Sequence, residues 1–141
     1  LISDNNFDGK YLEDVLQLFK ERASTLAELS DAMAFFFVKD VVMDPAACEK
    51  FFAQDMSAAF RALQSRFAQL QDFSAPRIEE DFRQAAADLG LTIKQLIHPL
   101  RVALSGKTVG PGMFEMIATL GRQRTLERIE RAIQLYKNKS V

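Results

Sequence analysis

Few residues suited to catalysis or metal binding occur in this sequence. It contains one histidine, His98, and one cysteine, Cys48, and neither has a second ligand or a base at a helical spacing around it. The acidic run 79–81 opens a predicted helix, where carboxylates complement the helix dipole. No G-x-x-x-x-G-K-S/T phosphate loop is found. The sequence therefore predicts no catalytic residue, no metal site and no cofactor held by this chain.

A basic segment with several glycines is the strongest remaining candidate for a site. It begins at Arg101, continues through Lys107, and reaches the apolar pair Met113 and Phe114 at a predicted helix start. Backbone N–H groups at a helix start contact phosphate, and apolar side chains pack against unstacked bases, as in proteins that read single-stranded RNA. Core packing is the alternative for both apolar residues, and it is the better one for Phe114.

The charge of the chain is divided unequally along its length. Residues 1–92 carry 9 Lys and Arg against 16 Asp and Glu (net −7), and residues 93–141 carry 9 against 3 (net +6), which together give −1. Basic residues gain affinity for nucleic acids by releasing counterions from the phosphates. We therefore consider Lys107, Arg122 and Arg124 as candidate contacts to an RNA backbone. A solvated basic face is the alternative.

Helical periodicity dominates, and no segment alternates apolar and polar residues for long enough to predict a strand. A first helix is predicted from Lys10 to near Arg22, where apolar residues recur every three to four positions. A capping box of Thr25 and Glu28 predicts the start of a second helix. Further starts are predicted at 44–45, where Asp precedes Pro, and at 55–57.

The polar stretch 72–76 ends in a proline and is the predicted boundary between two small helical subdomains, residues 1–73 and 74–141. In the second, helices are predicted at 76–89, 93–104, 112–120 and 123–136, with Gly90, Gly106 and Gly121 as stops. Pro99 is expected to kink or split the second of these helices. The predicted fold class is all-α, with about eight helices.

The longest apolar run, residues 33–38, is much shorter than the roughly 20 residues that span a bilayer. A single cysteine is typical of a reducing compartment. We therefore expect a cytoplasmic protein that does not bind a membrane, and we expect it to be a monomer.

Five short motifs occur in a fixed order. Residues 101–106 match R-x-A-L-S/T-G, residues 110–115 match S/T-P-x-L/M-F-E except at the first position, and residues 120–129 match L-G-x-x-R-x-L-x-R-I/L. Upstream, residues 22–29 match R-x-x-T-L-x-E-L/F, and residues 36–40 form an aromatic-acidic segment. With these motifs, nearly the whole chain resembles the C-terminal anticodon-binding region of bacterial glutamyl-tRNA synthetases, which are class I glutamate–tRNA ligases.

The resemblance implies a fold and a set of RNA contacts. In the family this region is a pair of helical subdomains, an α-helix cage, that binds the anticodon loop. Arg22 is similar to the arginine that senses the third anticodon base in members that discriminate glutamate from glutamine tRNAs. Arg101, Pro111 and Met113 are similar to the residues that hold the first two bases. Gly110 departs from the usual Ser or Thr, so a hydroxyl contact there is lost or replaced by the backbone.

The resemblance also implies a longer enzyme. The family's catalytic half, with its HIGH and KMSKS motifs, precedes this region, and neither motif occurs here. We expect a chain that begins within a longer protein and cannot charge tRNA alone. ATP and Mg²⁺ are implied for the complete ligase, and the implied partner is a glutamate tRNA, with glutamine isoacceptors as a further option.

Two other functions remain open from the residues themselves. The segment from Met113 through Gly121 into a basic helix is also compatible with a DNA-binding helix-turn-helix, in which Arg122, Arg124 and Arg128 face the major groove. A helical protein-interaction module with a basic face is the third interpretation.

Overall fold

A computed structural model describes residues 9–19, 34–37, 41, 43–108 and 111–139 of the chain. Within these residues it contains seven α-helices, one 3-10 helix and no strand, which confirms the predicted all-α class. The elements are α1 (Gly9–Phe19), η1 (Ala34–Phe37), α3 (Pro45–Phe51), α4 (Ser57–Gln69), α5 (Ala75–Leu89), α6 (Ile93–Ser105), α7 (Met113–Leu120) and α8 (Arg122–Lys139).

The helix starts follow local side-chain chemistry. Thr92 and Gln95 form a reciprocal capping box at the start of α6, because the Thr92 hydroxyl accepts the Gln95 N–H at 3.1 Å and the Gln95 side chain accepts the Thr92 N–H at 2.8 Å. Pro45 opens α3 after Asp44, as predicted. The predicted capping residues Thr25 and Glu28 lie outside the described residues.

Glycines end the helices where the sequence predicts a stop. Gly90 and Gly106 adopt left-handed backbone angles, with φ of 71° and 78°, after α5 and α6. The Gly106 N–H donates to the Val102 carbonyl oxygen at 2.7 Å and so satisfies one of the last carbonyls of α6. Helix α6 is continuous through Pro99, so the predicted split does not occur.

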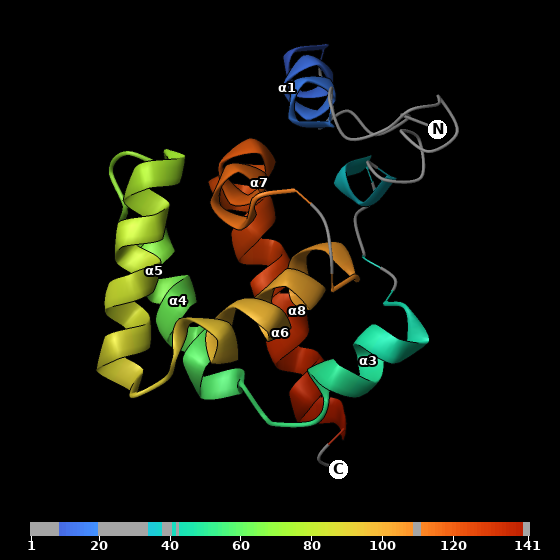
Figure 1. Ribbon diagram of the computed structural model, residues 1–141, viewed down its shortest axis with the longest axis vertical. Helices are drawn as coiled ribbons and strands as arrows, with labels where there is room; N and C mark the ends of the chain where they lie inside the picture. The colour runs from blue at the N-terminus through green and yellow to red at the C-terminus, as the bar shows by residue number, and fades with distance from the viewer. Residues whose placement is uncertain (1–8, 20–33, 38–40, 42, 109–110, 140–141) are drawn as a thin grey trace.

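Helix α8 runs through the middle of the molecule, and the other helices are arranged around it (Figure 1). Helix α4 makes the most extensive helix-to-helix contact of the described residues with α8, and α5 packs on α4 and α7. On the other side of the view, α3 lies against α6, while α1 contacts α7 (Figure 1).

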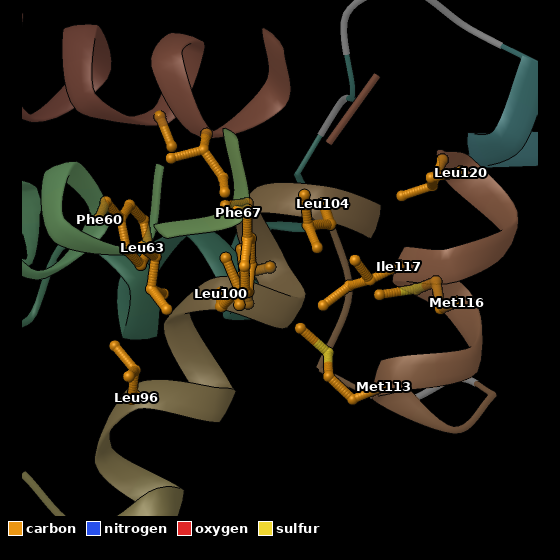
Figure 2. Close-up of a cluster of buried hydrophobic side chains, with 14 of the residues drawn as sticks. Phe60, Leu63, Phe67, Leu96, Leu100, Leu104, Met113, Met116, Ile117 and Leu120 are labelled. Carbon is orange, nitrogen blue, oxygen red and sulfur yellow. The ribbon is translucent and has the colours of Figure 1, made fainter. Parts of the chain in front are cut away.

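One cluster of buried apolar side chains joins the helices. Figure 2 shows Phe60, Leu63 and Phe67 of α4 close to Leu96, Leu100 and Leu104 of α6. The cluster contains residues from both sides of the predicted boundary at 73/74, and it is continuous across it within the described part of the chain. The division into subdomains 1–73 and 74–141 stays a prediction.

Candidate nucleic-acid interface

The connection between α6 and α7, residues 106–112, lies at the centre of the predicted site. Its two ends are held together. The Arg101 Nη1 atom donates to the carbonyl oxygen of Pro111 at 2.8 Å, across the base of the connection. The Ser105 hydroxyl donates to the Arg101 carbonyl oxygen at 2.8 Å and accepts the Lys107 N–H at 3.2 Å. Arg101, Pro111 and the backbone of Lys107 are thus brought together, and their use as one binding site stays a prediction.

The structure distinguishes the two apolar residues at the start of α7. Met113 is 4% exposed and lies in the buried cluster beside Leu100 and Ile117 (Figure 2). Phe114 is half-buried and packs edge-on against Phe82 of α5, with ring centroids 5.4 Å apart. The sequence favoured core packing for Phe114 over Met113, and the burial has the opposite order because Met113 faces α6.

A carboxylate lies at the start of α7. A Cβ atom at Gly112 would lie 2.4 Å from Glu115 Oε2, so this side chain folds back over the first turn. A negative charge there complements the helix dipole and opposes a phosphate at the same place. This position is therefore better suited to the hydrogen-bond donors of a base than to a phosphate.

The arginines of α8 bind backbone carbonyls at the ends of other elements. Arg122 donates to the Leu70 carbonyl oxygen after α4 and lies 5.4 Å from the centre of the Phe73 ring. Arg124 donates to the Leu120 carbonyl oxygen at 3.1 Å and lies 3.8 Å from the centre of the Tyr11 ring. Because the last carbonyls of a helix have no partner within it, a cation there is favourable.

Two further arginines of α8 act in the same way. Arg128 donates to the carbonyl oxygens of Leu104 and Phe35, both at 2.6 Å, and Arg131 donates to that of Val41 at 2.6 Å. This role is not predicted from the sequence. Basic residues at 122, 124, 128 and 131 indicate a cationic helix, but their spacing does not say which carbonyls will face it.

These contacts are relevant to two roles predicted for the arginines of α8, DNA binding and contact with an RNA backbone. The helix-turn-helix interpretation needs Arg122, Arg124 and Arg128 to face DNA, whereas their guanidinium groups donate to carbonyls of the protein itself. The structure therefore does not favour that interpretation. Arg122 and Arg124 are half-buried, and their predicted contact with an RNA backbone stays a prediction.

Burial shifts the pKa of two side chains, Tyr11 of α1 and Arg128 of α8. Removal from water lowers the pKa of Arg128 to about 10, and burial raises the pKa of the Tyr11 hydroxyl to about 12 against the opposing charges of Arg124 and Arg128. Near pH 7 Arg128 remains charged and Tyr11 remains neutral. The Tyr11 hydroxyl donates to the Phe36 carbonyl oxygen at 2.8 Å.

Arg22 and Gly110 lie outside the described residues, as does the helix predicted from Thr25. Among the described residues, the next element along the chain after Arg22 is η1, and Arg128 joins its Phe35 carbonyl to the Leu104 carbonyl of α6. Element η1 is thus held next to the start of the α6–α7 connection.

No group of three or more His, Cys, Asp or Glu side chains suited to a metal ion is found among the described residues. Cys48 is half-buried on α3, and His98 is exposed on α6. The helices of the described ranges also include none that is long and apolar enough to cross a membrane.

Three curated relatives illustrate what the chain is similar to, and each is named a glutamate–tRNA ligase. The chain is 35% identical over 135 residues to that of Caldicellulosiruptor saccharolyticus, covering 96% of this chain and 28% of the relative. It is 37% identical to that of Syntrophobacter fumaroxidans, covering 89% and 27%. It is 42% identical to that of Desulforudis audaxviator, covering 87% and 25%.

Solved structures give the same result for the fold. A crystal structure of a glutamate tRNA ligase from Elizabethkingia meningosepticum, in complex with its amino acid, superimposes with a TM-score of 0.80 at 27% identity. A glutamate-tRNA synthetase from Elizabethkingia anophelis superimposes with a TM-score of 0.76 at 26% identity. The matches cover 90% of this chain and 25% and 24% of those chains, respectively.

The chain spans about a quarter of the length of the relatives it matches, from 25% to 28% for those named above. The sequence profile of the anticodon binding domain matches residues 2–133, which is nearly the whole chain. The fold and this match agree, and the chain belongs to the anticodon binding domain family.

Proposed function

We propose that this chain binds the anticodon loop of a glutamate tRNA, as the anticodon-reading part of a glutamate–tRNA ligase. The match to the anticodon binding domain family over residues 2–133 carries this proposal. The geometry supports it, because Arg101 and Lys107 provide cationic groups at a connection whose ends are tied by the 2.8 Å bond from Arg101 to Pro111. The similarly named ligases among the relatives indicate the tRNA.

The residues of the connection have different roles in this proposal. Arg101 contacts one of the first two anticodon bases, because a guanidinium offers planar donors that match base edges. Lys107 contacts the RNA backbone. Pro111 and Met113 are buried side chains, so they act by shaping the connection and by the backbone groups at the start of α7.

Gly110 contributes its backbone, and Arg22 reads the third base. Arg122 and Arg124 add positive charge close to the RNA, while their guanidinium groups stabilise the fold. The protein-interaction module is the alternative, and no contact in the described residues favours it over RNA binding.

The complete enzyme in this proposal attaches glutamate to tRNA with ATP and Mg²⁺, and its catalytic groups lie outside this chain. The chain itself is non-catalytic and monomeric. Whether the enzyme also accepts glutamine isoacceptors depends on the third anticodon base, which is the base assigned to Arg22.

Binding of RNA hairpins tests the function directly. One hairpin carries a glutamate anticodon in its loop, and a second has the same stem and the same loop composition in scrambled order. We expect the chain to bind the first at least about tenfold more tightly, which corresponds to roughly 1.4 kcal/mol. Equal binding of both hairpins, or tighter binding of duplex DNA than of the first hairpin, would overturn the proposal.

A further inference from the structure

A groove lies between α3 and α6, next to the proposed anticodon site. It encloses about 350 Å³ and is lined by Lys50, Phe51, His98, Pro99, Val102 and Thr108. In Figure 1, α3 lies beside α6 on the side where the α6–α7 connection leaves α6. The volume is near the lower limit for small-ligand sites, and it suits one nucleotide rather than a larger ligand.

The floor of the groove is apolar and firmly held. Phe51 and Val102 are each 1% exposed, and Pro99 is half-buried beside them. The Phe51 ring stacks on Tyr136 of α8, with centroids 4.4 Å apart, and its carbonyl oxygen accepts the Tyr136 hydroxyl at 2.8 Å. Phe51 and Val102 therefore close the bottom of the groove, and Pro99 is the apolar lining residue that remains open to the face of an unpaired base.

The rim of the groove is polar and carries one lysine. Lys50 and His98 are exposed, Thr108 is half-buried, and none of the described lining residues is acidic. Glu49 and Asp44 belong to the same stretch of chain as Lys50, but neither lines the groove. A lysine, an imidazole and a hydroxyl around an apolar floor complement a phosphate that is attached to a base.

The groove continues the proposed anticodon surface. His98 precedes Arg101 by three residues on α6, so the two lie on neighbouring positions of one helix face. Thr108 directly follows Lys107, and the Asp44 N–H donates to the Gly106 carbonyl oxygen at 3.0 Å. This bond ties the start of α3 to the connection, so groove and connection form one continuous surface.

We propose that this groove binds one unpaired nucleotide of the same RNA loop, adjacent to the anticodon bases. The base lies against Pro99, above the buried Phe51 and Val102, and its phosphate lies between Lys50 and His98. This inference rests on the proposed function, because the charge of the rim identifies an RNA phosphate only where RNA is the partner. The groove then extends RNA binding beyond the anticodon triplet.

The test combines protein variants with modified RNA. The double variant Lys50→Ala with His98→Ala removes the lysine and the imidazole of the rim, and Arg77→Ala, which removes one cation elsewhere, is the control. Arg77 is an exposed cation on α5, across the molecule from α3 (Figure 1), where it pairs with Glu80 at 3.5 Å. We expect the double variant to bind the glutamate-anticodon hairpin about tenfold less tightly, with a smaller salt dependence, while the control binds nearly as well as the unmodified chain.

Hairpins that lack one base each locate the nucleotide. In the unmodified chain, loss of the base that occupies the groove weakens binding, and in the double variant the same loss has a smaller effect because base and rim act together. Thermal unfolding of each variant confirms that the fold is retained.

The two proposals fail in different ways. If the unmodified chain prefers the glutamate anticodon but every base-loss penalty is the same in the double variant, the groove proposal is wrong and the proposed function stands. If the unmodified chain shows no anticodon preference, the proposed function fails, and the groove proposal falls with it. If Arg77→Ala loses as much affinity as the double variant, the groove proposal is also wrong. The weaker binding would then follow from the loss of a positive charge anywhere on the chain, and not from its position at the groove.

Discussion

The guanidinium of Arg128 donates a hydrogen bond of 2.6 Å to the carbonyl oxygen of Leu104, in the last turn of α6. A second bond of 2.6 Å joins the same guanidinium to the carbonyl oxygen of Phe35 in η1. One buried side chain thus joins three elements that are far apart in the sequence. Because it satisfies a terminal carbonyl of α6, it also holds the point at which the α6–α7 connection begins.

Replacement of Arg128 tests this role. Arg128→Met keeps the length of the side chain but leaves two carbonyl oxygens without this donor, and we expect the free energy of unfolding to fall by about 3 kcal/mol. Urea denaturation measures the change. Arg83→Met, at an exposed arginine that pairs with Glu79 at 2.8 Å, is the control and should change stability by less than about 1 kcal/mol. Equal effects of the two substitutions would contradict the assignment.

Gly121 separates α7 from α8 in a conformation that other residues rarely adopt, with φ of 87° and ψ of 162°. We expect Gly121→Ala to lower the free energy of unfolding by about 1–3 kcal/mol, although a Cβ there meets no atom within 4 Å. Gly90→Asn is the control, because φ of 71° and ψ of 26° are angles that asparagine tolerates. A Gly121→Ala protein as stable as the unmodified chain would show that the α7–α8 turn relaxes.

Glu130 makes stability depend on pH. Hydrogen bonds from Gln134 and Gln64, together with Arg61, lower the pKa of its carboxyl group from 4.5 to about 2. The folded pKa lies below the unfolded one, so the contribution is fully present above about pH 4.5 and is lost as pH falls towards 2.

The Glu130→Gln variant isolates this contribution. Because the Glu130 side chain is 41% exposed, we expect solvent screening to limit the contribution to below about 1 kcal/mol. Urea midpoints measured between pH 6 and pH 2.5 should therefore fall more for the unmodified chain than for Glu130→Gln. Parallel curves for the two proteins would argue against a stabilising role of the ionised carboxyl group.

Arg101 has a structural and a proposed recognition role, and two substitutions separate them. Arg101→Ala removes the bond to Pro111 and the proposed base contact, and we expect hairpin binding to weaken by about 1–3 kcal/mol. Arg101→Lys keeps the charge but not the planar donors. If Arg101 contacts a base, the lysine variant loses preference for the glutamate anticodon; a uniform loss for every loop sequence would instead assign Arg101 to a phosphate.

Arg22 is the residue to which the third anticodon base is assigned. We expect Arg22→Gln to reduce the discrimination between glutamate and glutamine anticodons, because a neutral amide lacks the guanidinium fork. Hairpins that differ only in the third base measure this effect, and thermal unfolding checks the fold. Unchanged discrimination would remove Arg22 from the proposed site.

Local signals explain why most helices were predictable. Thr92 with Gln95, Asp44 with Pro45, and the glycines at 90, 106 and 121 act within a few residues of themselves, so the sequence is enough to locate these helix ends. Pro99 shows the limit of such reasoning. A proline inside a helix predicts a kink or a split, and the split does not occur, because α6 stays continuous with Leu96, Leu100 and Leu104 buried on one face.

The candidate site also has features that the sequence predicts and features that depend on tertiary packing. The sequence by itself determined the all-helical class, the connection between the helices that carry Arg101 and Met113, and the motifs of the family, because each depends on residues close together in the chain. Only the tertiary structure decided that Met113 is buried and that the arginines of α8 bind backbone carbonyls. The physical reason is that the partner of a side chain depends on which helix ends pack beside it. The packing of the whole core brings the carbonyls of Phe35 and Leu104 to α8.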